Sequence, residues 1–359
     1  WVCTFLKSGA IELGEKLAYW QKKFGYIDTH HQVVFSTLDA EFKRCLNAMG
    51  VATPLDSDKA SSLLKSTIDD LGIRRNGEPL RQEDYSTIES IVTYYRGRLT
   101  NRYSHPSAID YDLTGSIMDL LVKQFADKRR VAGIMDFDEM SEILYQYLYV
   151  TPNPKVQDFV ANRYNYIYID EFQDTSQLAY AILKFYARGK LAVNNGKKEV
   201  QTVTDINLVT KSDDDSIEFE GLVNNVSTLG KVVVIGDTSQ CIYSFRGSDS
   251  TILAVDFAKD FAPTKCALSY NWRCPSNILN PIVPCIHQNT YSKHQLIQAS
   301  NEGGEFFAYD FATYKAMVDK MQLDVEQDLN DGLNVAILVR TNYDGAVPAF
   351  VLATNAKYD

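Results

Sequence analysis

The stretch from Tyr166 to Thr175 constrains the fold of this chain more than any other. It reads Tyr-Ile-Tyr-Ile-Asp-Glu-Phe-Gln-Asp-Thr, an apolar and aromatic run that ends abruptly in two adjacent carboxylates, Asp170 and Glu171. Runs of this kind, rich in β-branched and aromatic residues, are typical of buried strands. The stretch therefore predicts a core strand that carries two acidic side chains at its carboxyl end.

A helix is predicted directly after this strand. The apolar side chains that follow recur at helical spacing, and they are preceded by residues that commonly cap helices. The stripe consists of Leu178, Ile182, Leu183 and Tyr186, and the capping residues are Asp174, Thr175 and Ser176. A strand that leads into a helix through a short acidic turn indicates an α/β fold with a parallel sheet. Both carboxylates then lie at the carboxyl edge of the sheet, where open α/β sheets bind their ligands.

The paired carboxylates suit the hydrolysis of a nucleoside triphosphate. This reaction needs a metal ion that neutralises charge and a group that orients the attacking water. Asp170 could hold Mg²⁺, through water because Mg²⁺ keeps much of its hydration shell, and Glu171 could polarise the attacking water. The alternative is that the pair only caps a helix, and for an isolated Asp-Glu pair this alternative is the more frequent one.

Two further stretches favour the catalytic interpretation. In Lys231–Gly247 a second apolar strand ends at Gly236-Asp237, and a polar tip follows it. Leu268–Leu279 reads Leu-Ser-Tyr-Asn-Trp-Arg-Cys-Pro-Ser-Asn-Ile-Leu. In this order and at these spacings, the three stretches resemble motifs II, III and IV of the UvrD/Rep-type superfamily 1 DNA helicases.

The resemblance implies ATP and Mg²⁺ as cofactors and assigns a role to each matched residue. The nucleotide-site residues are Asp170 as the metal ligand, Glu171 as the group that activates water, Gln173 as a cofactor-binding residue, Gln240 as the sensor of the γ-phosphate, Arg273 as an arginine finger and Trp272 as the residue that stacks on adenine. Relatives usually carry Tyr at the position of Trp272. The larger π-surface of Trp should keep the stacking role.

The same resemblance implies single-stranded DNA, and junctions of single- and double-stranded DNA, as partners. Thr4 and Phe5 lie in a stretch similar to motif Ia, and Phe35 lies in a stretch similar to motif Ib, where Ser36 stands in place of the family's usual His. Tyr243, Phe245 and Arg246, at the end of the motif III stretch, are expected to face the DNA. The alternative for the two aromatic residues is a place in the core of a domain interface.

A RecA-like motor domain with a helical insertion and part of a second RecA-like domain is the architecture that the resemblance implies. The expected segments are 1–52 as the first part of domain 1A, 53–130 as the helical insertion 1B, 131–262 as the rest of 1A with a polar hairpin near 193–230, and 263–359 as part of domain 2A with a strand in 334–342. In the insertion the candidate phosphate-binding residues are Arg96, Arg98, Arg102 and Tyr103.

The chain contains no phosphate-binding sequence of the form G-x-x-x-x-G-K-[ST]. The nearest string, Gly9 to Lys16, has Glu15 where this sequence needs Lys, and it falls in a predicted helix whose apolar stripe is Leu13, Leu17, Trp20 and Phe24. Motifs V and VI are not found either. We expect the chain to be a truncated part of an ATP-dependent helicase, moving 3′ to 5′ in its complete form and inactive alone.

Two other functions stay open at this point. The same motifs occur in the motors of helicase–nucleases, and a degenerate motor could serve as a non-catalytic DNA-binding scaffold. The net charge of −10 does not indicate a nucleic-acid-binding protein, although a local basic groove is compatible with it. The six cysteines show no paired metal spacing, and His30-His31 is expected in a loop; reduced thiols, a cytoplasmic location and no membrane contact are the simplest expectation.

Overall fold

The computed structural model describes residues 1–5, 7–25, 33–51, 54–193, 231–293 and 295–339. The chain divides into two compact units. The larger unit consists of Trp1–Leu268 and Ile286–Gln295, and the smaller unit consists of Ser269–Cys285 and Leu296–Asp359. The predicted hairpin near 193–230 falls outside the described residues except for position 193. The His30-His31 pair falls outside them entirely.

A parallel sheet forms the centre of the larger unit. Its described strands are β1 (Val2–Thr4), β2 (Phe35–Thr37), β3 (Tyr166–Ile169) and β4 (Lys231–Val234). They are arranged in the order β2-β1-β3-β4, and all neighbouring strands run parallel. The predicted α/β fold with a parallel sheet is therefore confirmed, and the carboxyl ends of β1, β3 and β4 lie along one edge.

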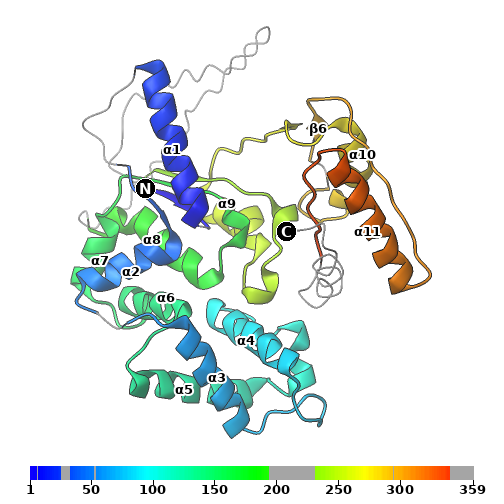
Figure 1. Cartoon of the computed structure of the whole chain (residues 1–359). Coiled ribbons are helices and arrows are strands. Elements are labelled where there is room, and N and C mark those ends of the chain that lie inside the picture. Colours follow the sequence, from blue (N-terminus) through cyan, green and yellow to red (C-terminus); the bar gives the residue numbers. More distant parts are fainter. Residues whose placement is uncertain (6, 26–32, 52–53, 194–230, 294, 340–359) are drawn as a thin grey trace. The chain divides into compact units, whose positions relative to one another are not determined.

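Helices connect and cover these strands (Figure 1). Those of the sheet-containing part are α1 (Lys7–Phe24), α2 (Leu38–Ala48), α6 (Phe137–Tyr145), α7 (Pro154–Ala161), α8 (Gln177–Val193) and α9 (Phe257–Phe261). The predicted stripe of α8 is buried against the sheet, and Ser176 caps the helix by accepting a hydrogen bond from the backbone N–H of Ala179 (3.2 Å). Asp174 and Thr175 lie in the preceding turn instead of capping the helix.

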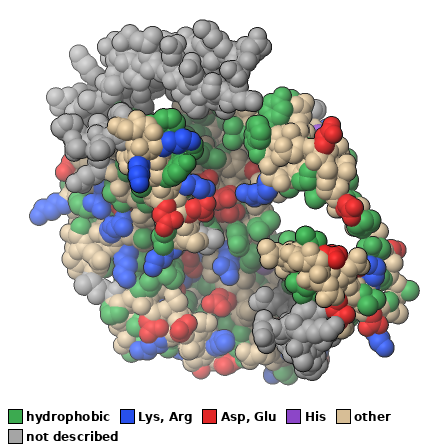
Figure 2. Space-filling view, turned by 45° about the horizontal axis from the view of Figure 1, so that its top comes forward, with side chains coloured by type: hydrophobic (Ala, Val, Ile, Leu, Met, Phe, Trp, Pro, Cys, Tyr) green, Lys and Arg blue, Asp and Glu red, His purple; other side chains and the backbone are tan. Residues whose placement is uncertain are grey.

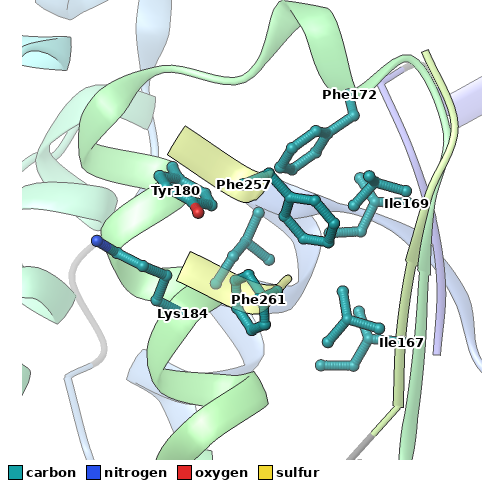
Figure 3. A pocket seen from close by; sticks show the side chains of 10 residues that line it. Ile167, Ile169, Phe172, Tyr180, Lys184, Phe257 and Phe261 are labelled. Atoms are coloured by element: carbon teal, nitrogen blue, oxygen red, sulfur yellow. The ribbon is translucent and has the colours of Figure 1, made fainter. Parts of the chain in front are cut away.

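The core behind β3 and β4 is shown in Figure 3. Ile167 and Ile169 of β3 face the aromatic rings of Phe172, Phe257 and Phe261, and only about 10 Å³ of space remains among the residues of this region. Burial of these side chains stabilises the fold by roughly 25 cal/mol for each Å² of apolar surface removed from water. This packing holds the carboxyl end of β3 in place, and the space is too small for a ligand.

The predicted core strand β3 is buried on one face only. Its side chains alternate, with Ile167 and Ile169 buried and with Tyr166 and Tyr168 exposed, the latter by 43%. Successive side chains of a strand point to opposite faces, and the helices of the described core pack against the isoleucine face. Tyrosine tolerates such a partly exposed position because its ring carries a polar hydroxyl group.

The apolar stripe of α1 is also less buried than its spacing predicts. The helix exists over Lys7–Phe24, but Trp20 and Phe24 are exposed and stack on each other with a centroid distance of 5.4 Å. A helix of 18 residues is about 27 Å long, whereas a strand of 3 residues spans about 10 Å. The far end of α1 therefore projects beyond the strands that its near end covers (Figure 1).

The predicted helical segment 53–130 has a hydrophobic core of its own. It contains α3 (Ser57–Asp70), α4 (Gln82–Gly97) and α5 (Gly115–Ala132), which gather at one end of the larger unit (Figure 1). Leu64, Ile68, Ile88 and Ile91 are buried in this core. A core separate from that of the sheet means that this helical body packs largely on itself.

A buried ionic cluster joins the helical body to α6. The guanidinium of Arg96 in α4 donates to the carboxylate of Asp136, the N-cap of α6 (2.7 Å), and to that of Glu142 within α6 (2.7 Å). Arg129 of α5 also pairs with Asp136. The Arg96 side chain is only 1% exposed. The prediction that Arg96 contacts DNA phosphate is therefore wrong, because its donors are bound by carboxylates inside the fold.

The other three candidate phosphate-binding residues are also engaged within the unit. Arg98 forms an ion pair with Asp249 (3.0 Å), Arg102 lies 3.9 Å over the ring of Tyr95, and the hydroxyl of Tyr103 donates to Asp119. These contacts tie the chain of the helical body together and to the loop after β4. They leave no described side chain of this set directed wholly to solvent.

The smaller unit contains β5 (Tyr270–Asn271), β6 (Gln298–Ala299), α10 (Ser276–Ile286, shared with the larger unit at Ile286) and α11 (Tyr314–Asn330). The strands β5 and β6 pair in parallel. The strand predicted in 334–342 is not found in its described part, 334–339, where Leu338 is 94% exposed. An extended segment counts as a strand only when a neighbour pairs with it, and no described strand does so here.

Two further observations concern the chain as a whole. All six cysteines are described and none forms a disulfide. Among the described helices, none combines the length and the apolar character that crossing a membrane requires.

Candidate functional site

The candidate site is built on the carboxyl ends of three adjacent strands. The backbone N–H of Asp170 donates to the carbonyl of Cys3 in β1 (2.9 Å), and the N–H of Phe172 donates to the carbonyl of Ile235 after β4 (2.9 Å). Asp170 and Glu171 are thereby fixed between the ends of β1 and β4. The sequence predicted this position for the two carboxylates, and the strand pairing agrees with it.

Glu171 occupies an unusual backbone conformation. Its φ of 53° and ψ of 41° lie in the left-handed region, which costs a non-glycine residue roughly 1–2 kcal/mol. The turn Phe172–Asp174 follows, with Phe172 in the core while Glu171 stays exposed. The conformation thus sends the side chains of two neighbouring residues in different directions, one into the core and one to the edge of the sheet.

Gln173 connects this turn to the loop after β4. Its side-chain amide donates to Oε2 of Glu171 (2.7 Å), and its Oε1 accepts from the backbone N–H of Asp237 (3.1 Å). The residue is only 1% exposed. The sequence predicted Gln173 as a cofactor-binding residue but gave no sign that its amide links the turn after β3 to the loop after β4.

The loop after β4 is organised around Asp237. Its two carboxylate oxygens accept from the backbone N–H of Ser239 (2.9 Å) and from the side-chain amide of Gln240 (3.0 Å). Gln240, the predicted γ-phosphate sensor, is itself exposed at the tip of the loop. The carboxylate of Asp237 therefore holds the side-chain amide of Gln240 at the same sheet edge as Asp170.

The segment Ile286–Gln295 of the larger unit braces this loop, which the sequence did not predict. The buried hydroxyl of Ser292 lies 2.6 Å from the hydroxyl of Ser239 and 3.0 Å from that of Thr238. The amide of Asn289 donates to the carbonyl of Thr238 (3.3 Å). No sequence pattern signals such a contact between serines more than fifty positions apart.

Burial sets the electrostatics of Asp170–Asp174, which we call the acidic turn. Removal from water raises the pKa of Asp170 above its ordinary value, and the neighbouring charge of Glu171 acts in the same direction. Burial and Glu171 also raise the pKa of Asp174 to about 6, and one oxygen of this carboxylate has no hydrogen-bond partner among the described residues. Burial and like charge therefore both disfavour the ionised forms of Asp170 and Asp174.

The donor chemistry of this turn fits Mg²⁺. This ion prefers oxygen ligands, uses one or two carboxylates and keeps several of its water molecules. Asp170 and Glu171 supply such oxygens from adjacent positions at the sheet edge. In the described part of the chain, no group of three or more His, Cys, Asp or Glu side chains is arranged as a metal site.

A row of aromatic rings lies beside the acidic turn. Phe5, directly after β1, stacks on Tyr243 with a centroid distance of 5.4 Å and an interplanar angle of 24°. Tyr243 in turn contacts Phe245 (6.2 Å), and the guanidinium of Arg246 lies 5.7 Å from the Phe245 ring. Phe5, Phe245 and Arg246 are exposed. Four of the predicted DNA-binding residues therefore form one continuous surface, which we call the aromatic row.

The other two predicted DNA-binding residues are placed differently. Thr4 is 4% exposed beneath Gly9 of α1, where a Cβ atom would lie 3.4 Å from its hydroxyl. Phe35 is half-buried and faces Gly14 of the same helix. Their DNA contacts stay predictions, and in this structure both side chains support α1.

The loop that carries the aromatic row is anchored to the helical body. Ser248 donates to the carbonyl of Asp174 (2.7 Å), and the ion pair of Arg98 with Asp249 joins the loop to the end of α4. Gly247 adopts a φ of 95°, a left-handed conformation that suits glycine, and a Cβ atom there would meet the carbonyl of Tyr94 at 3.4 Å. The acidic turn, the loop and the helical body thus form one connected structure.

Trp272 and Arg273 lie in the smaller unit. Both are exposed, Trp272 by 72%. The side-chain oxygen of Asn271 accepts from the backbone N–H groups of Arg273 (2.9 Å) and Cys274 (2.8 Å). This turn fixes the backbone while both side chains remain accessible.

The visible surface agrees with the acidic composition. Figure 2 shows Lys and Arg interspersed with Asp and Glu on this face instead of a broad basic surface. Long-range attraction of nucleic acid is therefore not a general property of this face. A nucleic-acid contact would depend on local groups such as the aromatic row and Arg246.

Comparison with known families places the chain in a class. The family model described as the UvrD/REP helicase N-terminal domain matches residues 1–206, and the chain belongs to this family. The parallel sheet and its helices accordingly represent a RecA-like fold.

Individual relatives agree with this assignment. The chain is 22% identical to a probable DNA helicase II homolog of Mycoplasma capricolum over 84% of its own length and 36% of that protein. It is 21% identical to the ATP-dependent DNA helicase UvrD1 of Mycobacterium tuberculosis, covering 94% of this chain and 40% of the relative. For the ATP-dependent DNA helicase PcrA of Staphylococcus aureus the identity is 23%, with 96% and 42% covered. The chain thus spans about two fifths of the length of these relatives.

Proposed function

We propose that this chain is part of an ATP-dependent DNA helicase, which couples ATP hydrolysis to movement along single-stranded DNA. The observation that carries the proposal is the continuous connection from the acidic turn through Gln173 and Asp237 to the aromatic row. A motor needs such a connection because hydrolysis must depend on the state of the DNA site. Names of the relatives as DNA helicases support the same function.

At the nucleotide site each residue receives one role. Asp170 would hold Mg²⁺, which on binding neutralises charge on the phosphates. Glu171, exposed at the edge of the sheet, orients the attacking water, and its left-handed backbone directs its side chain there. Gln240, exposed at the loop tip, senses the γ-phosphate by motif position. Asp174 is a third acidic group of the turn and is buried.

At the DNA site the aromatic row accepts bases by stacking. Every base has a π-face, so stacking tolerates any sequence, which a translocating enzyme requires. Phe5 and Phe245 expose their rings, Tyr243 joins them, and Arg246 can contact a phosphate. This assignment gives the exposed rings a function, whereas the alternative of a core position does not fit the exposure of Phe245.

The smaller unit supplies two proposed roles. Trp272 stacks on adenine and Arg273 contacts the γ-phosphate as an arginine finger, both by motif position. The accessible side chains on a fixed Asn271 turn support these roles. We further propose the segments 1–52 and 131–262 as domain 1A, 53–130 as 1B and 263–359 as part of 2A, with 3′ to 5′ movement and a preference for junctions.

The test uses the complete gene product. We expect ATP hydrolysis that single-stranded DNA stimulates, and strand displacement on a duplex with a 3′ single-stranded tail. In Glu171→Gln, ATP binding should persist while hydrolysis falls by at least about 10²-fold, because the metal ligand remains and the water-orienting group is lost.

Three other results are informative. A wild-type protein that binds DNA but neither binds nor hydrolyses ATP would indicate a non-catalytic scaffold. Cleavage of DNA together with unwinding would indicate a helicase–nuclease. Equal loss of ATP binding and hydrolysis in Glu171→Gln would contradict the role of Glu171 and leave it a structural residue.

A further inference from the structure

Gln173 is a buried residue whose side-chain amide is used at both ends. Its Nε2 donates to Glu171 Oε2 (2.7 Å), and its Oε1 accepts from the backbone N–H of Asp237 (3.1 Å). At 1% exposure the residue has almost no surface for a nucleotide. A direct cofactor contact, which sequence analysis predicted, would require this amide to leave both of its partners.

Glu171 depends on this contact for its side-chain orientation. It is exposed, and the hydrogen bond from Gln173 is the one that fixes its carboxylate among the described residues. A long exposed side chain has several rotamers available, and each hydrogen bond that selects one of them reduces this freedom. Gln173 therefore determines where the carboxylate of Glu171 lies.

Gly236 shows that this arrangement is tightly fitted. A Cβ atom at position 236 would lie 2.6 Å from Oε1 of Gln173 and 3.0 Å from a methyl group of Leu253. The backbone of Gly236 is not among the positive-φ glycines, so its conformation does not demand glycine. The close approach of the Gln173 amide does. Gly236 and Gln173 thus form a matched pair, one leaving the space that the other fills.

We propose that Gln173 is a positioning residue that holds Glu171 in register with the loop after β4. The loop side of the bond is Asp237, whose carboxylate also binds Gln240 and Ser239. The same loop continues to Tyr243 in the aromatic row. A shift of this loop when DNA binds is passed through Gln173 to the residue that orients the attacking water.

This inference rests on the proposed ATP hydrolysis, and its test uses the complete gene product. Gln173→Leu keeps the approximate volume and removes both hydrogen bonds. We expect DNA-stimulated kcat to fall about 10- to 100-fold, because misplacing a reacting group by about 1 Å has an effect of this size. The KM for ATP and the affinity for single-stranded DNA should change less than about threefold. Loss of both kcat and ATP affinity in parallel would instead favour direct cofactor binding.

Gln173→Glu separates the two bonds. Its carboxylate can still accept from the N–H of Asp237, but it can no longer donate to Glu171 and places a like charge beside it. We expect a loss of kcat at least as large as in Gln173→Leu, and a melting temperature below that of Gln173→Leu, because a buried charge without a partner is introduced. Wild-type turnover in Gln173→Glu would overturn the proposal, because the bond to Glu171 would then be dispensable.

Gly236→Ala perturbs the same contact without changing residue 173 itself. The new methyl group displaces Oε1 of Gln173, so kcat should fall in the same way, and the double variant with Gln173→Leu should be no worse than the more impaired single variant. Multiplying effects would mean that the two residues act independently and would contradict the matched pair.

Gln177→Leu is the matched control. Gln177 is four positions further on and also bridges two segments, accepting from the N–H of Leu99 and donating to Asp249, but it makes no contact with Glu171. Its replacement should lower the melting temperature while retaining most of kcat. If wild-type protein shows no ATP hydrolysis, the proposed function fails and this inference with it; if wild type is active and Gln173→Leu equals it, only this inference fails.

Discussion

At the scale of single residues, Asp174 shows how the acidic turn balances charge against burial. It is 9% exposed, and its Oδ1 has no hydrogen-bond partner among the described residues. Burial and the charge of Glu171 raise its pKa from 3.8 to about 6. The folded state therefore binds a proton at Asp174 more readily than the unfolded chain does. The resulting penalty is absent below about pH 4, grows between pH 4 and 6, and is complete above pH 6.

Asp174→Asn should remove this penalty. We expect the larger unit to gain stability at pH 7.5 by at most about 3 kcal/mol, the equivalent of the shift from 3.8 to about 6, and to gain much less at pH 4. The free energy of unfolding, measured with denaturant at both pH values and without Mg²⁺, tests this. Asp127→Asn, at an exposed ion pair with Arg130, is the control and should change stability by less than about 1 kcal/mol. An equal gain at both pH values would mean that charge is not the cause.

The aromatic row leads to a second prediction at this scale. Replacing Tyr243 and Phe245 by Ala should weaken binding of single-stranded DNA by roughly 1–3 kcal/mol for each base that loses its stacking partner. The loss should be similar for different sequences, because stacking does not read base edges. Fluorescence anisotropy with oligonucleotides of several compositions measures it. Phe24→Ala, at the exposed end of α1, should leave the affinity unchanged. Unchanged affinity in the double variant, or its unfolding, would favour a packing role.

At the scale of elements, α4 and α6 are joined by the buried ionic cluster of Arg96, Arg129 and Asp136. Arg96 binds Asp136 and Glu142, and its positive charge helps to hold the pKa of Asp136 below its ordinary value despite burial. Removing one partner from a buried ion pair leaves the other charge uncompensated, which costs about 3–5 kcal/mol. The helical body and the sheet-containing part are therefore joined by a contact that is expensive to break.

Arg96→Met should accordingly destabilise the larger unit by about 3–5 kcal/mol. The effect should shrink at low pH, because the carboxylate of Asp136 becomes protonated as pH falls through its lowered folded pKa. Chemical denaturation across pH 3–8 checks both parts. Arg130→Met, which removes an exposed pair with Asp127 on α5, is the matched control and should cost less than about 1 kcal/mol. A similarly small loss in Arg96→Met would show that the cluster contributes little net stability.

Sequence patterns predicted the elements better than their surroundings. The strand ending at Asp170 and the buried stripe of α8 follow from periodicity, which depends only on local spacing. The exposed face of β3 could not be predicted, since exposure depends on which helices cover a sheet. The engagement of Arg96 by Asp136 joins positions forty residues apart and carries no periodic signal. The bridge of Gln173 to Asp237 was missed for the same reason, although a glycine at the end of a strand, Gly236, is a sign of close approach.

At the scale of the whole molecule, the chain consists of two units, and each contains residues with a proposed role in nucleotide hydrolysis. The acidic turn belongs to the larger unit, and the Asn271 turn with its exposed neighbours belongs to the smaller one. Motif order along the chain allowed the sequence to predict both sets of residues. Motif order could not predict the contact of Ser292 with Ser239. The segment Ile286–Gln295 lies between two stretches of the smaller unit along the chain, but it belongs to the larger unit.

Two neighbouring residues of the smaller unit test its proposed part in nucleotide hydrolysis. Trp272 offers a flat π-surface and Arg273 a fixed cationic fork, so their losses should differ. Trp272→Ala should weaken ATP and ADP binding alike, because both nucleotides carry adenine. Arg273→Ala should spare ADP and reduce DNA-stimulated turnover steeply, by roughly 10³–10⁵ as for other arginine fingers, because its partner is charge on the transferred phosphoryl group. ADP affinity and turnover are measured for each variant of the complete gene product.

Asn271→Ala, which removes the acceptor of the turn, shows what loss of the turn alone does. If all three variants gave one profile, the turn would be structural and the two separate roles would be wrong.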